Sequence, residues 1–115
     1  MTSRPRFLQG IFRFEGRGLD QPFLLDPSLT YVVPRDTEAQ LVYLRAGNAS
    51  GELITLIIAR DGEPMRYFPV AAKGDTHVAL RVVEDLLAET RVDLLLAAPE
   101  GSGQVVVDVG LVEVG

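Results

Sequence analysis

The sequence predicts an all-β domain, an antiparallel β-sandwich of jelly-roll type with about eight strands and at most one short helical turn. Glycine and proline recur at short, nearly even intervals along the 115 residues. The segments between them are rich in Val, Ile, Leu, Tyr and Thr, which strands favour. No segment has the pattern of a long amphipathic helix. Short strands with turns roughly every 8 to 12 residues are typical of a sandwich or barrel.

The expected strands are apolar or β-branched segments bounded by turn signals, with 22–24 as a short extra: 7–14, 29–33, 39–46, 52–60, 65–70, 76–83, 90–97 and 104–114. Asp61-Gly62 is the clearest hairpin signal, because glycine tolerates the positive φ of a tight turn. Segments 47–51 and 99–103 have hairpin length, and 73–75 predicts a fourth turn. A helical turn is expected within 82–90.

Alternation along the later strands assigns a core face. In 76–83, Val78, Leu80 and Val82 share one face, with His77 and Arg81 on the other. In the last two strands the same alternation gives the core positions Val92, Leu94, Leu96 and Ala98, then Val105, Val107, Val109 and Leu111. These side chains are expected to fill the space between two packed sheets.

Two of the expected strands are apolar on both faces, 39–46 and 52–60. A sheet with one wet face should alternate apolar and polar side chains, so a second cover is expected over these strands. Either the segment 15–28 or another subunit would supply it, since contiguous exposed apolar patches commonly mark interaction surfaces. The interface residues expected on this basis are Leu41, Ile54, Leu56 and Ile58.

Composition limits the function classes. The length fits a single domain, 1–115. Without cysteine the chain has no disulfide, thiolate metal site or cysteine nucleophile. A net charge of −5, with the basic residues spread along the chain, argues against a nucleic-acid partner. The apolar runs are far shorter than the roughly 20 residues of a membrane helix, and no secretory signal is recognisable, so we expect a soluble cytoplasmic protein.

Three stretches carry a family resemblance: 10–16 (GIFRFEG), 39–46 (AQLVYLRA) and 104–114 (QVVVDVGLVEV). In their order they resemble the galactose-binding-like jelly rolls, the fold of many carbohydrate-binding modules. The last strand of that family typically runs as an apolar stretch, one or two Asp, then Val-x-Leu-x-Glu and an apolar residue. The resemblance covers most of the chain and implies a fold more than a function.

The resemblance implies two binding features. Many members hold a structural calcium near the first and last strands, and Glu15 and Asp108 stand where its carboxylates would be. The alternative is that Asp108 simply points outward on a solvated face. Sugar binders of this fold stack exposed Trp or Tyr on the sugar ring; this chain has no Trp, so Tyr43 or Tyr67 would take that role. No other cofactor is expected.

The most chemically mixed stretch is 60–69 (RDGEPMRYFP). Its Arg and Tyr side chains either form the rim of a ligand site or belong to a hairpin held by ion pairs, and arginine offers a two-pronged contact to carboxylate or phosphate. His77 and Arg81 share a strand face and would extend that rim. The candidate ligand-binding residues are Tyr43, Arg45, Arg66, Tyr67, His77 and Arg81.

The residues give little support for catalysis. His77 would be the only base for a Ser-His-acid triad, and no nucleophile-elbow pattern surrounds a serine. We therefore expect a non-catalytic binding or assembly module that uses an apolar sheet face for self-association or for a protein partner. The alternative is a small-ligand or carbohydrate-binding domain with a groove lined by Tyr43 or Tyr67.

Overall fold

The computed structural model describes residues 2–81 and 84–115, and most of them are in β-strands. The strands are β1 (Ser3–Leu24), β2 (Thr30–Val32), β3 (Glu38–Asn48), β4 (Ile54–Arg60), β5 (Glu63–Val70), β6 (Asp75–Ala79), β7 (Asp85–Leu86) and β8 (Arg91–Val114). A 3-10 turn, η1 (Pro27–Leu29), is the helical element of this part of the chain, and none of its helices is long enough to cross a membrane. The predicted all-β fold class is confirmed.

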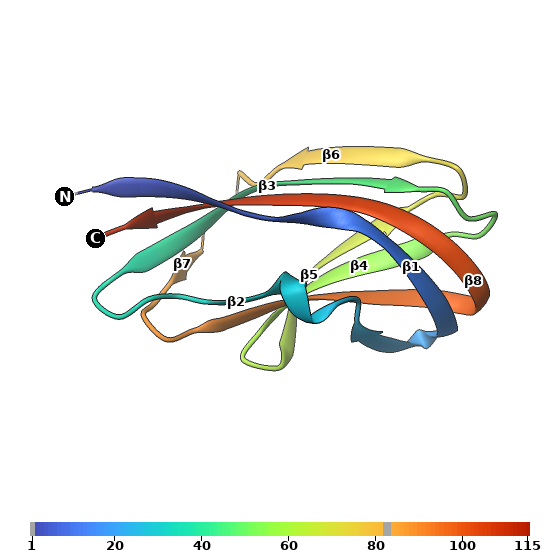
Figure 1. Cartoon of the computed structure of the whole chain (residues 1–115), viewed down its shortest axis with the longest axis horizontal. Helices are drawn as coiled ribbons and strands as arrows, with labels where there is room; N and C mark the ends of the chain where they lie inside the picture. The colour runs from blue at the N-terminus through green and yellow to red at the C-terminus, as the bar shows by residue number, and fades with distance from the viewer. Residues whose placement is uncertain (1, 82–83) are drawn as a thin grey trace.

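The strands form one antiparallel sheet that folds over on itself into two layers (Figure 1). In the β3 layer the order is β6-β3-β8-β1, with the last part of β8 and the first part of β1. In the β4 layer the order is β5-β4-β8, and β2 and the end of β1 pair with the other side of β8. The long strand β8 is therefore central in both layers. The two layers pack face to face as a β-sandwich.

The segment 99–103 is a corner inside β8 instead of the predicted hairpin, so that prediction is wrong. At this corner β8 passes from one layer to the other, and β1 turns beside it, with register shifts after Gly16. A Cβ atom on Gly16 would lie 1.9 Å from the carbonyl oxygen of Pro99. Only glycine permits this approach of two backbones. The pairs of strands predicted as 7–14 and 22–24, and as 90–97 and 104–114, are accordingly single strands.

The Asp61-Gly62 hairpin is confirmed. Both residues have positive φ, 49° and 86°, as a two-residue turn matching the strand twist requires. The helical turn predicted within 82–90 is not formed in its described part, because Asp85–Leu86 is strand β7 and pairs with β3. Val82, predicted as a core residue, lies outside the described residues.

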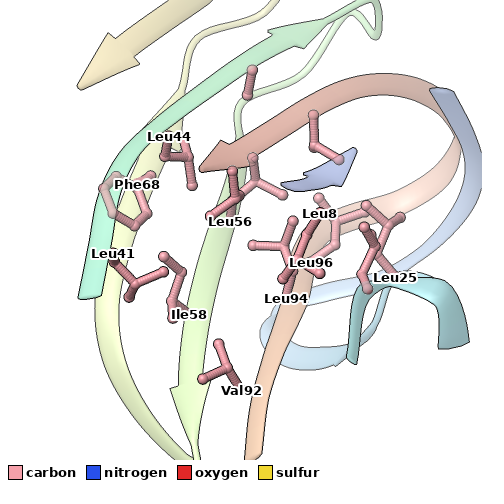
Figure 2. Packing of buried hydrophobic residues seen from close by; sticks show 14 of the residues in the cluster. Leu8, Leu25, Leu41, Leu44, Leu56, Ile58, Phe68, Val92, Leu94 and Leu96 are labelled. Atoms are coloured by element: carbon pink, nitrogen blue, oxygen red, sulfur yellow. The ribbon is translucent and has the colours of Figure 1, made fainter. Parts of the chain in front are cut away.

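The core lies between the two layers. All eight positions predicted from 92–98 and 105–111 are buried, while Val78 and Leu80 are partly buried against the cluster. The interface prediction for four residues is wrong, because their side chains are buried in this core: Leu41, Ile54, Leu56 and Ile58. Figure 2 shows Leu56 and Ile58 among the labelled leucines of β3 and β8. The sequence correctly indicated that these strands are apolar on both faces. The residues predicted to contact a partner, however, are those on the face that points into the core.

The outward face of β4 does not need the predicted cover. Ile57 and Ala59 point away from the core and are still buried, with neighbours on both β5 and β8. In the segment 15–28, expected as a cover, Gly18, Phe23 and Leu24 instead extend the sheet by pairing with β8.

Candidate functional site

A shallow groove of about 450 Å³ lies on the outer face of the β3 layer. Its floor is formed where β3, β6 and β8 run side by side, and Gly47 opens it because glycine has no side chain. Charged and polar side chains surround this floor, namely Arg45, Asp75, Thr76, His77 and Asp108, with Val106 beside them. The groove offers donors and acceptors together on one open surface.

Tyr43 lies beside this groove and contacts two of its lining residues, Asp108 and His77. Its ring lies across Gly110, where a Cβ atom would stand 2.1 Å from a ring carbon. The Tyr43 hydroxyl donates a hydrogen bond to Asp108 Oδ1 at 3.0 Å, and burial together with this bond raises the pKa of Tyr43. The ring meets His77 edge to face, with centroids 6.0 Å apart. Tyr43 therefore links a carboxylate on β8 to an imidazole on β6.

Arg45 and His77 are cross-strand partners on β3 and β6, and both side chains are exposed. Arg45 Nη1 lies 4.0 Å from Asp108 Oδ2, a weak surface ion pair. Guanidinium, imidazole and carboxylate groups of this kind can hydrogen-bond hydroxyl or carboxyl groups of a small polar ligand. These groups lie together on an open surface.

The structure brings three of the six predicted ligand-binding residues together and separates the other three. Arg45 and His77 line the groove, and Tyr43 lies beside it in contact with His77. Arg66 and Tyr67 lie on the edge strand β5 of the β4 layer, where Arg66 Nη2 contacts Glu84 Oε1 at 2.9 Å. Arg81 is exposed beyond the end of β6. The predicted rim fails as one site because the sequence did not show that β5 and β6 belong to different layers.

Glu15 and Asp108 do not form the calcium site that the family resemblance implied. Glu15 lies opposite Ser102 and accepts a hydrogen bond from its hydroxyl at 2.6 Å, whereas Asp108 lies opposite Gln9. At ~3.3 Å per residue, the stretch of β1 from Gln9 to Glu15 keeps the two carboxylates about 20 Å apart. Within the described residues no group of three or more potential ligands gathers. Calcium takes six to eight oxygen ligands, so these residues do not fit it.

An exposed apolar patch borders the groove on the β1 side, formed by Phe7, Ile11 and Val106, which we call the β1 patch. Their side chains are 52%, 65% and 49% exposed. Ile11 and Val106 are cross-strand partners, and Phe7 lies four residues from Ile11 on the same outward face of β1. Large apolar side chains gathered in this way on an open sheet face are typical of an interaction surface.

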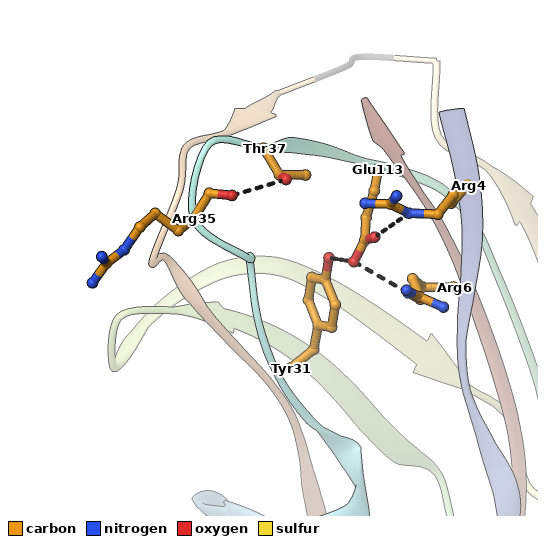
Figure 3. Close-up of polar contacts among 6 residues, drawn as sticks. All are labelled: Arg4, Arg6, Tyr31, Arg35, Thr37 and Glu113. Carbon is orange, nitrogen blue, oxygen red and sulfur yellow. Dashed lines mark hydrogen bonds and ion pairs between the residues drawn. The ribbon is translucent and has the colours of Figure 1, made fainter. Parts of the chain in front are cut away.

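One buried carboxylate, at the end of the sandwich, was not predicted from the sequence. Glu113 is 1% exposed and accepts a hydrogen bond from the Tyr31 hydroxyl, and it pairs with Arg4 at 3.4 Å and Arg6 at 3.2 Å (Figure 3). The bond from Tyr31, followed by the arginines, lowers the pKa of Glu113 despite its burial. Alternation from Val105 to Leu111 already places position 113 on the core face, which is the signal that could have found it.

Asn48 is the second buried polar residue with a structural role. Its amide nitrogen donates to the carbonyl oxygens of Glu52, Val70 and Ala71, and its oxygen accepts from the backbone and hydroxyl of Ser50. These bonds tie the 47–51 connection to the end of β5. Asn48 therefore belongs to the scaffold behind the groove.

Comparison with known proteins supports the fold alone. No family model matches the chain, and no curated protein matches it. Structures of infectious bursal disease virus, Gt and Gx strains, align over 96% and 97% of the chain at TM-scores of 0.51 and 0.52, each with 12% identity. The crystal structure of a VP2 subviral particle of this virus aligns over 96% at a TM-score of 0.47. The chain spans 32% of the length of each of these chains. At this identity the likeness shows a shared β-sandwich fold.

Proposed function

We propose that the chain is a non-catalytic assembly module that associates with copies of itself through the outer face of the β3 layer. The observation that carries this proposal is the β1 patch, where Phe7, Ile11 and Val106 are each about half exposed or more. The core residues first expected to form the interface are buried, so this patch replaces them as the apolar contact surface.

Two further observations support an assembly role. The carboxylates and His77 of the groove lie in an open surface, without the enclosed pocket that chemistry usually requires. The solved structures that share the fold include chains from structures of infectious bursal disease virus. Fold likeness by itself carries little about function, so the weight of the proposal rests on the patch.

Sedimentation of the chain over a range of concentrations tests the proposal. We expect the average mass to rise from 12.5 kDa toward twice that value as concentration increases. Replacing Phe7 with Ser and Ile11 with Thr together should weaken association at least about tenfold, because burying one such side chain is worth roughly 1.5–3 kcal/mol.

The matched control is Val32→Thr. Val32 is 53% exposed on β2, in the other layer, and its replacement should leave association unchanged. A native chain that stays at 12.5 kDa at every concentration would overturn the proposed function. The proposal would also be overturned if Val32→Thr weakened self-association as much as the double variant does.

A second candidate function is the binding of a small polar ligand, as in galactose-binding-like domains. It is favoured by the groove, which Arg45 and His77 line and which Tyr43 borders through its contact with His77. A titration with neutral monosaccharides, followed by the melting temperature, tests it. A ligand that binds the folded state should raise the melting temperature, by mass action. Arg45→Gln should abolish the rise, and Arg35→Gln, an exposed site outside the groove, should keep it. No rise with any sugar would end this candidate.

A further inference from the structure

The first part of β1 is a long edge strand. Residues 3–16 pair with β8 on one side in an unbroken register, from Ser3 opposite Val114 to Gly16 opposite Gly101. Within the part of the chain that the structure describes, no strand pairs with the other side of this segment. Half of its C=O groups and, apart from Pro5, which has no N–H, half of its N–H groups therefore face outward, which makes the segment a template for another strand.

We infer that this edge pairs with the same edge of a second copy, antiparallel, with Gln9 opposite Gln9 of the second copy. The inference deepens the proposed function and rests on it, since it names the geometry of the self-association. In this register Phe7 of each copy lies opposite Ile11 of the other. The two exposed apolar side chains of β1 then cover each other across the new strand pair, as cross-strand apolar pairs do in stable sheets.

The charges of β1 are compatible with this register. Arg13 lies opposite Pro5 of the second copy, and Arg4 and Arg6 lie opposite Phe14 and Phe12, so no arginine stands directly opposite another. Arg4 and Arg6 also both pair with Glu113 of their own chain, which offsets one of their two positive charges. Like charges directly opposite would have destabilised the pair.

Symmetry closes the assembly at two copies. A two-fold axis through Gln9 makes the contact self-complementary, and such a contact uses up both edges that form it. The two β3 layers then form one continuous sheet across the dimer, with β6 at each outer edge. Both grooves lie on the same face of that sheet, one on each side of the axis.

The absence of cysteine allows a clean cross-linking experiment, because each variant contains a single thiol. In Gln9→Cys the two Cα atoms would lie roughly 4.5–5.5 Å apart, within the range of a disulfide. In Arg13→Cys they would lie about 25 Å apart at ~3.3 Å per residue. Gln9 and Arg13 are both exposed on β1, so neither substitution disturbs the core.

Each variant is incubated in a glutathione redox buffer and the dimer fraction is measured by non-reducing electrophoresis and mass spectrometry. We expect Gln9→Cys to form a disulfide-linked dimer at least tenfold faster than Arg13→Cys. Hydrogen exchange of the native chain should show the outward-facing amides of β1, at Phe7, Gln9, Ile11 and Arg13, becoming protected as concentration rises.

The outcomes separate this inference from the proposed function. If the native chain associates and loses association in the Phe7/Ile11 double variant, but both cysteine variants cross-link equally slowly, the layers stack face to face and edge pairing is wrong. Equal, fast cross-linking of both variants, or no change in amide protection, also overturns it. If the native chain does not associate, the proposed function fails first, in the sedimentation experiment.

Discussion

Replacing Glu113 with glutamine is expected to lower the free energy of unfolding by about 2–3 kcal/mol at pH 7. The carboxylate is 1% exposed and is satisfied by the Tyr31 hydroxyl and by Arg4 and Arg6. Glutamine has nearly the same shape and can still accept the bond from Tyr31, but it loses the attraction to both arginines. Urea unfolding at pH 7 measures the difference, with the exposed Glu100→Gln as the control expected to change stability little.

The loss from Glu113→Gln should depend on pH in one direction. The pKa of Glu113 is lowered in the folded chain from its ordinary value of 4.5, first by the hydrogen bond from Tyr31. A carboxyl group with a lowered pKa stabilises the folded state above its unfolded pKa, and this stabilisation is lost as the pH falls through the folded pKa. The difference in the free energy of unfolding between the native chain and the variant should therefore be largest at pH 7 and should decrease below about pH 4.5. A difference that is constant from pH 7 to pH 3 would show that charge is not its source.

Gly16→Ala should destabilise the chain by about 3 kcal/mol or more, because inserted atoms force backbone shifts in a well-packed site. The new methyl group would stand 1.9 Å from the Pro99 carbonyl oxygen, in contact with backbone instead of a movable side chain. The corner of β8 would have to open, and both layers depend on that corner. Thermal or urea unfolding measures the effect.

Gly51→Ala is the matched control for this corner. A Cβ atom at Gly51 meets nothing within 4 Å, so its substitution should change stability by no more than about 0.5 kcal/mol. Similar losses in the two variants would mean that glycine acts through chain flexibility at both positions and that the tight corner has no special role.

Local patterns predicted much of the fold. Val105, Val107, Val109 and Leu111 recur at every second position and are all buried, because a period of two places them on one face of the strand. Asp61-Gly62 supplied both positive-φ residues of a tight turn. These features depend on neighbours in sequence, which a single sequence displays directly.

Long-range geometry could not be predicted in the same way. Segment 99–103 has the composition of a turn, and only the approach of Gly16 from the other end of the chain shows that it is a corner. For the same reason the sequence predicted Tyr43, Arg45 and His77 as binding residues but could not show that they lie close together. Their proximity depends on the pairing of β3 with β6. The choice between inward and outward faces of β4 failed because both faces are apolar, so alternation carried no information there.

The central position of β8 has a consequence for how the chain reaches its folded state. β8 pairs with β1, β2, β3 and β4, so neither layer is complete until residues 91–114 have been synthesised. Until then β1 has no strand to pair with, and its apolar side chains remain exposed to solvent and to other chains. Domains dominated by contacts between distant residues fold slowly, in milliseconds to seconds. The order of synthesis thus places the main folding step after translation of β8, and until then β1 remains open to premature association with other chains.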